Sequence, residues 1–314
     1  MPAMRQVVVT PIYEDSEAAS RLFVELRRTL GPDLHVVAVD DGSVKEPVGP
    51  DMIRNAGLRG VVLRLKRNVG HQRAIAIGLC HVAETMPDAL CIVMDSDGED
   101  LPETVDQLLE ALEAQDSDAA VARRASRVET LRFKAFYQIY RLFFRLFAGR
   151  EIGFGNFMAL RPTAVKRLAA MQELWTHVAA CLIASKLRIA PVSIHRGPRY
   201  AGQSRMNFPG LVLHGFRALM VFAEDVLVRV GLFCLVVMVL STVGVAAVAL
   251  LKALGLATPG WFSVALGVLV GIFIQTGALT LMCLMLAGIS RNSALLPIDQ
   301  TVFIDEILAT DQTA

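Results

Sequence analysis

The chain has 314 residues, a formal net charge of +1 and a mean hydropathy of +0.49. This length allows one large or two ordinary domains, and a charge so close to zero gives no electrostatic reason to expect nucleic acid as a partner. The five cysteines are odd in number, widely spaced and without a Cys-x-x-Cys pair, so we expect reduced, buried thiols.

Apolar runs of strand length alternate with helical patterns over the first third of the chain. Alternation on this scale predicts an α/β fold with an open, mostly parallel sheet covered by helices on both faces. Strands are predicted at 6–10, 35–39, 61–65 and 90–94, with Pro11 ending the first, and helices at about 15–30, 74–82 and 102–112.

Polar side chains follow each of the four predicted strands at the point where the strand ends. Ligands of parallel sheets bind beyond the carboxyl ends of the strands, so we expect these side chains to meet at one edge. Four strands that are each followed by polar residues are harder to explain by chance than any single motif. The residues are Tyr13 and Glu14, Asp40 and Asp41, Asn68 and Gly70, and Asp95 and Asp97, in strand order.

Asp95 and Asp97 stand one residue apart at the end of a buried strand. Hard carboxylate oxygens suit Mg²⁺ or Mn²⁺, and such ions keep open positions for the phosphates of a substrate. The pair therefore indicates a nucleotide-sugar site with a divalent cation. Taken alone, the pair is equally compatible with a polar strand end before an acidic helix start, which the helix dipole favours.

The segment from 123 to 150 interleaves basic and aromatic residues. A helix of this composition, at about 127–150, can lie along a membrane surface with its rings in the interface and its cations near lipid phosphates. An ordinary amphipathic helix with an aromatic core stripe is the alternative. A second amphipathic helix is predicted at 207–225, where a plain linker helix is the alternative.

Two runs, at 230–251 and 261–289, contain no charged side chain, and each is long enough to span a bilayer. The short loop between them predicts a hairpin of two transmembrane helices. Arg229 and Arg291 flank the pair on the outside, whereas Lys252 is alone in the loop, so the positive-inside rule places both termini in the cytoplasm of a cell membrane. The N-terminus lacks the pattern of a signal peptide, so insertion is expected to rely on these helices.

Four motifs resemble the inverting family-2 glycosyltransferases with the GT-A fold: VVVTPIYED, VVAVDDGS, LKRNVGHQRAIAIGL and MDSDGEDLPE. The middle segment and the two apolar helices further resemble polyprenyl-phosphate glycosyltransferases, the group that includes dolichyl-phosphate mannosyltransferases and bacterial undecaprenyl-phosphate glucosyltransferases. The resemblance implies transfer of a sugar from a nucleoside diphosphate sugar, with UDP as the expected nucleotide, to a polyprenyl phosphate at the cytoplasmic membrane face. It also implies a Mg²⁺ or Mn²⁺ cofactor.

The resemblance assigns roles to three groups of residues. Asp95 and Asp97 would hold the metal, with Arg124 and Arg127 near the diphosphate as the other catalytic residues. The nucleotide would lie against Pro11, Tyr13, Glu14, Asp40, Gly70 and Arg73, while Asp41 and Ser43 would hold the turn. The acceptor phosphate would meet Arg132, Lys134, Arg199, Ser204 and Arg205.

The expected domains follow from these assignments. A GT-A domain would occupy 1–206, the juxtamembrane helix 207–225, the two membrane helices 226–290 and a cytoplasmic tail 291–314. Partners would be the nucleotide sugar, the polyprenyl phosphate and membrane lipids. Five glycines of the apolar helices offer small surfaces on which a homo-oligomer could pack, namely Gly231, Gly244, Gly267, Gly271 and Gly277.

At two positions the sequence departs from the family that it resembles. Asn156 stands where many members carry an aspartate, and Gly98-Glu99 stands where they often carry Leu-Gln. Asn156 cannot act as a base, but an ionised lipid phosphate does not need one. Transfer to a hydroxyl of a lipid or polysaccharide is one alternative, with Asp100 or Glu99 as the base, and a non-catalytic membrane adaptor is another.

Overall fold

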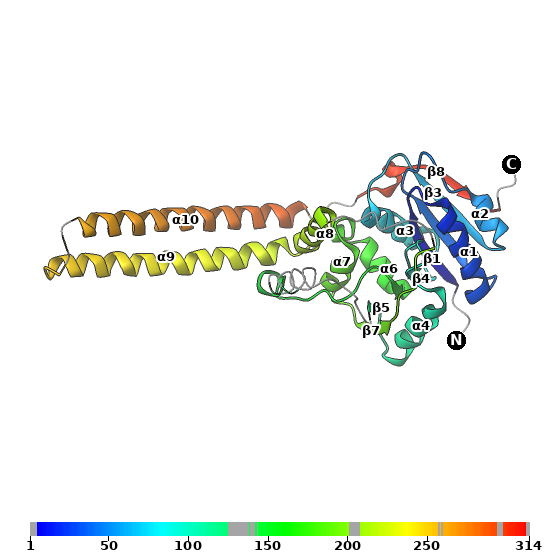
Figure 1. The fold of residues 1–314 in the computed structure, drawn as a ribbon, viewed down its shortest axis with the longest axis horizontal. Coiled ribbons are helices and arrows are strands. Elements are labelled where there is room, and N and C mark those ends of the chain that lie inside the picture. The colour runs from blue at the N-terminus through cyan, green and yellow to red at the C-terminus, as the bar shows by residue number, and fades with distance from the viewer. Residues whose placement is uncertain are drawn as a thin grey trace. The chain divides into compact units, whose positions relative to one another are not determined.

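A computed structural model describes residues 5–124, 138, 142, 144–200, 208–256, 258, 260–293 and 298–311, and it describes only the backbone at 124, 208, 209, 211 and 290–293. The chain divides into two compact units, whose elements are labelled in Figure 1. The first unit holds Met1–Ala135, Ile152–Val221 and Leu296–Ala314, and the second holds Phe136–Glu151 and Phe222–Leu295.

The first unit is built on one sheet, whose described strands run in the order β7-β5-β6-β4-β1-β2-β3-β8. The strands β4, β1, β2 and β3 are parallel to one another, as are β5 and β7, whereas β6 and β8 are antiparallel to their neighbours. The bounds are β1 (Gln6–Ile12), β2 (His35–Asp40), β3 (Arg59–Leu65), β4 (Leu90–Val93), β5 (Ala119–Arg124), β6 (Met158–Leu160), β7 (Ile189–Ile194) and β8 (Ile304–Ala309).

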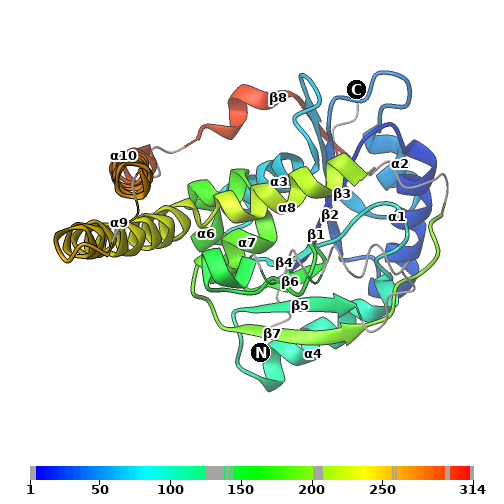
Figure 2. The same cartoon turned by 60° about the vertical axis from the view of Figure 1, so that its left-hand side comes forward.

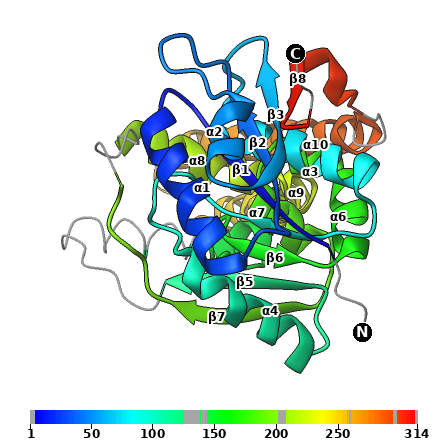
Figure 3. The ribbon, with the colours of Figure 1, turned by 90° about the vertical axis from the view of Figure 1, so that its right-hand side faces the viewer.

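Helices cover both faces of this sheet (Figures 2 and 3). They are α1 (Ser16–Leu30), α2 (Pro50–Asn55), α3 (His71–Thr85), α4 (Val105–Ala114), α6 (Pro162–Ala169) and α7 (Val178–Ala184), with 3₁₀ turns η1 (Pro102–Thr104), η2 (Gln172–Trp175) and η3 (Gln300–Phe303). The helix α8 (Phe208–Met220) packs against α7. The predicted α/β class with a mostly parallel sheet is thereby confirmed.

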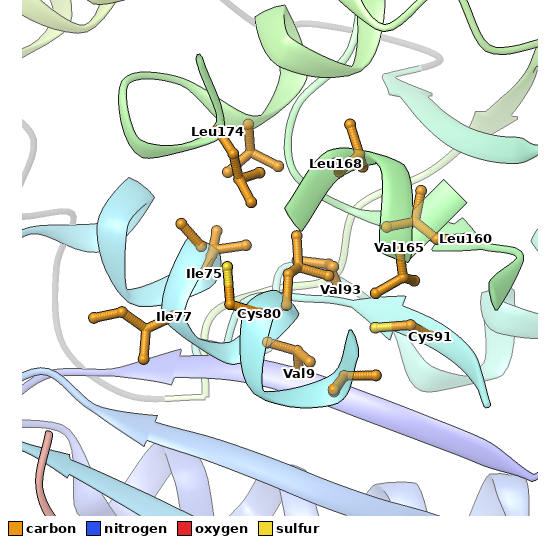
Figure 4. Packing of buried hydrophobic residues seen from close by; sticks show 14 of the residues in the cluster. Val9, Ile75, Ile77, Cys80, Cys91, Val93, Leu160, Val165, Leu168 and Leu174 are labelled. Carbon is orange, nitrogen blue, oxygen red and sulfur yellow. The ribbon is translucent and has the colours of Figure 1, made fainter. Parts of the chain in front are cut away.

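The strand β1 shows why both faces need a cover. Val7 and Val9 belong to one hydrophobic core and Val8 to the other, and all three side chains are fully buried. A parallel strand that is buried on both sides reads as a continuous apolar run, as this one does. The first core packs against α3 and α6, and Figure 4 shows Ile75 of α3 and Leu168 of α6 within it. The second core packs against α1 and α4.

The four predicted strands and three predicted helices are confirmed, with one correction at Pro11. This residue does not end the first strand, because β1 continues to Ile12 and Pro11 pairs with Val39 of β2. The carbonyl oxygen of Pro11 accepts a hydrogen bond from the Ser96 hydroxyl (3.3 Å), which lies in the loop after β4. The strand β4 has ended at this level, so the missing N–H of proline leaves no ladder bond unmade.

The sheet extends further at both sides than the sequence pattern indicated. The strands β5, β6 and β7 were not predicted, and β8 lies within the segment 291–314 that was expected only as a tail. The chain that follows β8 is fixed by polar contacts: the guanidinium of Arg54 donates to the Thr310 carbonyl oxygen (2.6 Å from Nη2), and the N–H of Gly60 donates to the Thr310 hydroxyl (3.1 Å).

The second unit is dominated by α9 (Ala223–Ala253) and α10 (Trp261–Ser293), which pack against each other. Among the described residues, Ala223–Ala253 and Trp261–Ile289 are long and apolar enough to cross a membrane, which confirms the two predicted apolar helices. The Ser241 hydroxyl donates to the Leu269 carbonyl oxygen (2.6 Å), so one polar group of the spans is satisfied within the hairpin.

Three of the five noted glycines line the contact between α9 and α10. A Cβ at Gly231, Gly244 or Gly277 would lie between 3.1 and 3.7 Å from a side-chain atom of the facing helix. A Cβ at Gly267 or Gly271 would meet nothing within 4 Å. The first three glycines therefore allow close packing between the two helices of the hairpin. The homo-oligomer stays a prediction.

The described part of the predicted basic and aromatic helix packs against the start of α9 within the second unit. The ring of Phe144 meets that of Phe222 edge-on at 5.8 Å between centroids, and the Arg150 guanidinium lies 5.3 Å above the Phe222 ring. Arg229 donates to the Leu146 carbonyl oxygen (3.2 Å). Phe144 is thus a core residue, whereas its neighbours Leu142 and Leu146 are exposed.

The predicted amphipathic helix before the membrane spans corresponds to α8, and a pair of imidazoles joins it to α7. Nδ1 of His177 accepts from the N–H of Ala180 (3.2 Å), so its Nε2 carries the hydrogen and donates to Nε2 of His214 on α8 (3.0 Å). Burial, with His214 beside it, lowers the pKa of His177 to about 3. The contact between the two helices therefore requires neutral histidines.

Acid is expected to destabilise the first unit through His177. The folded-state pKa lies below the ordinary value of 6.5, so the unfolded chain takes up the proton more readily. The stabilisation is complete above about pH 6.5 and is lost as the pH falls, by at most about 1.4 kcal/mol per pH unit. Thermal unfolding between pH 7 and 5 should show a shallower pH dependence in His177→Gln than in the unmodified protein. The exposed His195→Gln should leave the slope unchanged, and equal slopes in all three proteins would contradict the assignment.

Candidate active site

The carboxyl ends of the parallel strands point to one edge of the sheet, where β1 and β2 end together and β4 ends earlier, at Val93. Ile12 at the end of β1 pairs with Asp40 of β2, which in turn pairs with Arg64 of β3. On the other side of β1, Val93 at the end of β4 pairs with Val9. The polar residues that follow these strands therefore gather at a common edge, as the sequence pattern indicated.

The loop after β4 carries four carboxylates within six residues and is shaped by its own hydrogen bonds. Oδ2 of Asp100 accepts from the N–H of Asp95 (3.0 Å), and Oδ1 of Asp97 accepts from the N–H of Glu99 (2.9 Å). Asp100 is almost fully buried. These bonds fix the loop so that Asp95 and Asp97 stay close to each other at the sheet edge.

Two arginines from the chain after β7 pair with this acidic loop. Arg199 places Nη2 2.9 Å from Oδ2 of Asp97 and donates from Nε to Oε1 of Glu99 (2.9 Å). Arg196 donates to Oε2 of Glu99, and its Nη2 lies 3.7 Å from Oδ1 of Asp100. Charge-assisted contacts of this kind hold two cationic groups beside the carboxylates of the loop.

The departure at Gly98-Glu99 has a structural reason. Gly98 adopts a φ of 89°, and a Cβ there would lie 2.7 Å from ring atoms of Tyr200, so a leucine does not fit. Glu99 supplies the negative charge that pairs with Arg196 and Arg199, which a glutamine in its place would lack. The two substitutions thus match the loop that follows β7.

Asp95 is the most constrained carboxylate of the loop. Its Oδ1 is buried and has no hydrogen-bond partner within the described parts of the chain, although Nε2 of His71 lies 3.3 Å away. Burial raises the pKa of Asp95, but the positive charges of His71, Arg196 and Arg199 outweigh burial and hold this pKa below its ordinary value. Asp95 therefore stays ionised.

The charge of Asp95 raises the pKa of both of its neighbours, His71 and Asp97. Burial lowers the pKa of His71, but the Asp95 carboxylate outweighs burial and holds it above its ordinary value. Burial raises the pKa of Asp97, and repulsion from Asp95 raises it further. A bound cation would relieve both the repulsion between the two aspartates and the missing partner of Oδ1.

These features fit a divalent cation. Asp95 offers a buried, ionised oxygen that has no hydrogen-bond partner within the described parts of the chain, and Asp97 offers a second carboxylate one residue away. Across the described residues, no three histidines, cysteines or carboxylates gather into a site that could hold a metal by themselves. A cation at this pair would therefore complete its coordination with water or substrate oxygens, as Mg²⁺ and Mn²⁺ do in phosphate sites.

Two of the residues expected against the nucleotide bind the loop after β2. The Glu14 carboxylate accepts from the backbone N–H groups of residues 44–46 at 2.8–3.2 Å, which holds the pKa of Glu14 below its ordinary value. The Asp40 carboxylate is fully buried and accepts from the N–H groups of Ser43 (2.9 Å) and Val48 (3.0 Å). Both side chains therefore shape the nucleotide edge through the loop they hold.

Asp41 connects two loops of the same edge. Its Oδ1 accepts from the N–H of Val69 (2.7 Å) and its Oδ2 from the N–H of Gly70 (3.0 Å), in the loop before α3. Gly70 adopts a φ of 93°, which favours glycine. Asp41 was expected to bond the backbone of its own turn, but its carboxylate instead holds the loop before α3, and Asp40 accepts from the N–H of Ser43 in that turn.

The remaining predicted nucleotide residues differ in exposure. Tyr13 is 42 % exposed, Arg73 is exposed in the first turn of α3, and Pro11 is buried. Tyr13 and Arg73 are thus accessible at the common edge. For Arg124 the structure gives the backbone, which pairs with Ile194 at the end of β7. Five further predicted site residues lie outside the described residues. They are Arg127, expected near the diphosphate, and Arg132, Lys134, Ser204 and Arg205, expected near the acceptor phosphate.

The structure adds features that the sequence analysis did not assign. Arg196 pairs with the acidic loop although no role was predicted for it. A small cavity lies beside the loop, and its lining includes Arg123, Arg196, Asp100 and Phe157. The cavity could have been anticipated only from the pairing of β5 with β7, which brings Arg123 next to the chain that carries Arg196.

Comparison with known families then decides the class of the protein. The sequence matches the family described as Glycosyl transferase family 2 over residues 7–175, more than half of its length. The chain belongs to glycosyl transferase family 2. The predicted family and enzyme class are thereby confirmed, and the matched range contains every strand that delivers a carboxylate to the site.

Curated relatives of this family-2 glycosyltransferase include two bacterial transferases. The chain is 26 % identical over 215 residues to the undecaprenyl-phosphate 4-deoxy-4-formamido-L-arabinose transferase of Enterobacter sp. (strain 638), covering 65 % of this chain and 63 % of the relative. It is 25 % identical over 222 residues to the enzyme of the same name from Salmonella paratyphi B, covering 67 % and 65 %. The chain thus spans a little under two thirds of the length of these relatives.

A solved structure supports the predicted GT-A fold class. Glucosyl-3-phosphoglycerate synthase from Mycobacterium tuberculosis, in complex with Mn²⁺, uridine diphosphate and glucosyl-3-phosphoglycerate, aligns with a TM-score of 0.50. The alignment covers 71 % of this chain and 80 % of that protein at 14 % identity. At this level of identity the similarity concerns the fold, which the two chains share.

Proposed function

We propose that this family-2 glycosyltransferase moves a sugar, with inversion, from a nucleoside diphosphate sugar to a polyprenyl phosphate at the membrane surface. The observation that carries the proposal is the acidic loop after β4, in a chain with two helices long enough to cross a membrane. Within the described residues, Oδ1 of Asp95 in this loop has no hydrogen-bond partner. The names of the curated relatives, which are undecaprenyl-phosphate transferases, favour the same acceptor class. UDP is the expected nucleotide.

Asp95 and Asp97 are the proposed ligands of a Mg²⁺ or Mn²⁺ ion. When bound, the ion would neutralise the charge that develops on the leaving nucleoside diphosphate. The two aspartates would bind and orient the ion. The N–H of Glu99 donates to Oδ1 of Asp97, and Oδ2 of Asp97 faces Arg199. Pro11, Tyr13, Gly70 and Arg73 are proposed to contact the nucleotide, with Glu14 and Asp40 acting through the loop that they hold.

The acceptor phosphate is proposed to meet cationic side chains beside the acidic loop. Arg199 is present at that place, where it pairs with Asp97 and Glu99. Arg124 and Arg127 are proposed to act at the diphosphate, and Arg132, Lys134, Ser204 and Arg205 at the acceptor phosphate, as expected from the resemblance. Arginine suits phosphate because its planar donors match two oxygens at once.

The contacts of the acidic loop favour a phosphate acceptor over a hydroxyl. A hydroxyl needs a base, and the candidates were Asp100 and Glu99. Asp100 is buried and bonded to the N–H of Asp95, and Glu99 is paired with Arg196 and Arg199, so neither carboxylate is available to take a proton. An ionised phosphate is already nucleophilic.

The proposal includes a location and partners. Both termini and the catalytic unit would face the cytoplasm, with the polyprenyl phosphate reaching the site from the membrane, and a homo-oligomer is allowed. A non-catalytic adaptor is disfavoured because the aspartate pair is intact and Oδ1 of Asp95 has no hydrogen-bond partner among the described residues. If the chain were only an adaptor, Asp97→Ala would leave any cellular phenotype unchanged.

Purified protein tests the proposal directly. In detergent with Mn²⁺ and undecaprenyl phosphate, a panel of nucleotide sugars should contain one donor from which nucleoside diphosphate is released. The lipid product should be cleaved by mild acid, because a glycosyl phosphate is acid-labile and a glycoside is not. Absence of release from every donor would refute the proposal, and an acid-stable product would support the hydroxyl acceptor instead.

A further inference from the structure

The chain that follows β7 is joined to the acidic loop by backbone hydrogen bonds. The N–H of Gly197 donates to the carbonyl oxygen of Glu99 (3.0 Å), and the N–H of Tyr200 donates to the carbonyl oxygen of Asp97 (2.8 Å). Arg199 lies between these two donors in the sequence. Its backbone is therefore held on both sides by the loop that its side chain contacts.

Two glycines let the side chains of these stretches interlock. A Cβ at Gly98 would lie 2.7 Å from ring atoms of Tyr200, so the ring lies directly against the Gly98 backbone. A Cβ at Gly197 would overlap the Leu101 side chain and would lie 2.8 Å from the carbonyl oxygen of Gly98. Each stretch thus carries one large side chain and one glycine that receives the large side chain of the other. We call Gly98, Leu101, Gly197 and Tyr200 the clasp.

Tyr200 is also fixed from the side of α1. Its half-buried ring packs against the hydrophobic core that α1 and α4 cover. Its carbonyl oxygen accepts from Nη1 of Arg21 (3.0 Å), and Nη2 of Arg21 lies 2.7 Å from Oε1 of Glu17, one turn earlier in α1. The clasp is therefore attached to a helix that is itself anchored in the core by Leu22 and Phe23.

The clasp leaves the backbone of Arg199 little freedom. The side chain of Arg199 uses Nε for Glu99 and Nη2 for Asp97, and within the described residues no hydrogen bond or ion pair involves its Nη1. A phosphate could meet Nη1 while both of these contacts remain. Ordering a flexible residue on binding costs free energy, and a residue that is already ordered avoids this cost.

We propose that Tyr200 and Arg21 are positioning residues, which hold Arg199 in place for the acceptor phosphate before that phosphate binds. The inference rests on the proposed function in that Arg199 is taken as a partner of this phosphate. Tyr200 and Arg21 act through the backbone of the chain after β7 and do not touch the substrate. Gly98, where relatives often carry leucine, makes room for the Tyr200 ring.

The test is Tyr200→Ala in the full-length protein in detergent with Mn²⁺. Microscale thermophoresis measures the dissociation constants of undecaprenyl phosphate and of UDP separately. We expect the first to rise about tenfold, roughly the cost of ordering the backbone of one residue. The second should change by less than about twofold, because the acidic loop keeps its own bonds to Asp100 and Asp97. Tyr200→Phe keeps the ring and should retain the affinity of the unmodified protein.

Arg21→Met removes the second attachment without changing the core. It should raise the dissociation constant of undecaprenyl phosphate about threefold, the effect of one lost hydrogen bond. Arg28→Met is the matched control, because it takes the same charge from the same helix. Arg28 pairs with Glu25, and none of the contacts of the described residues joins it to the backbone after β7. Arg28→Met should leave both dissociation constants unchanged.

A double variant separates the positioning of Arg199 from general damage to the site. In an Arg199→Met background, Tyr200→Ala should cause no further loss of undecaprenyl phosphate affinity, because the residue that it positions is gone. Equal losses with and without Arg199, or an unchanged affinity in Tyr200→Ala, would overturn the inference alone. If the unmodified protein bound undecaprenol as tightly as undecaprenyl phosphate, or if Arg199→Met kept full affinity, the proposed acceptor role of Arg199 would be wrong, and the inference with it.

Discussion

Replacing Asp97 with asparagine is expected to lower kcat/KM for sugar transfer by about a thousandfold, which corresponds to about 4 kcal/mol of lost transition-state stabilisation. The substitution keeps the shape of the side chain, and its oxygen can still accept from the N–H of Glu99. It removes the charge that faces Arg199 and that would face a cation. The loss should therefore fall on the chemical step and on metal affinity, with little effect on folding.

The measurement compares initial rates of nucleoside diphosphate release over a range of Mn²⁺ concentrations. Asp106→Asn, at an exposed carboxylate of α4, is the matched control and should behave as the unmodified protein. The thermal unfolding midpoint of Asp97→Asn should stay within a few degrees of the unmodified value. If Asp97→Asn kept more than a tenth of the activity at saturating Mn²⁺, the acidic pair would not be the centre of the reaction.

The sequence predicted the edge of the sheet because its signals are local. Each strand that reaches the site is an apolar run buried on both faces, and the polar residues stand directly after it. The apolar run predicted the strand, and the position of the polar residues predicted the edge at which they meet. The ends then meet at one edge because the strands are parallel and adjacent, with Ile12 beside Asp40 and Val9 beside Val93. The outer strands gave weaker signals, since β6 has only three residues and β7 alternates in burial.

The roles of individual carboxylates could not be predicted, because their partners are distant in the chain. Asp40 and Asp41 are adjacent and chemically identical, yet Asp40 binds the loop up to Val48, whereas Asp41 binds the loop at Val69 and Gly70. No spacing rule distinguishes the two. Asn156 could be recognised as unusual, but its contacts with residues of α3 require the fold that brings them together.

The tail after the two apolar helices gave no structural signal, because β8 has the sequence Ile-Asp-Glu-Ile-Leu-Ala, with charged residues in its middle. An edge strand needs only one buried face, and charges on the outer edge prevent pairing with other chains. Its partner β3 explains the position: Glu306 pairs with Arg64 at 2.7 Å, and the register places Ile307 beside Leu63. The position of β8 therefore follows from its pairing with β3 and could not be predicted from its own sequence pattern.

Ending the chain after residue 297 is expected to destabilise the catalytic unit by about 4 kcal/mol, although the acidic loop and the hairpin remain. The deletion removes β8 and exposes the edge of β3, with several backbone hydrogen bonds worth about 1 kcal/mol each. It also removes Phe303, whose ring lies 5.6 Å from that of Trp175. For a domain of this size the thermal midpoint should fall by about 8–16 °C.

The same deletion is expected to weaken nucleotide binding, because η3 supports the loop that carries Gly70. The carbonyl oxygen of Phe303 accepts from the N–H of Lys66 (3.0 Å), and the other end of that loop is held by Asp41 at Gly70. Thermal unfolding and UDP titration in detergent should therefore both change, while a chain ending at Asp311 should match the full-length protein in both. An unchanged midpoint in the shorter chain would mean that β8 contributes nothing to the sheet, and an unchanged UDP affinity would mean that the Asp41 contact alone holds the loop.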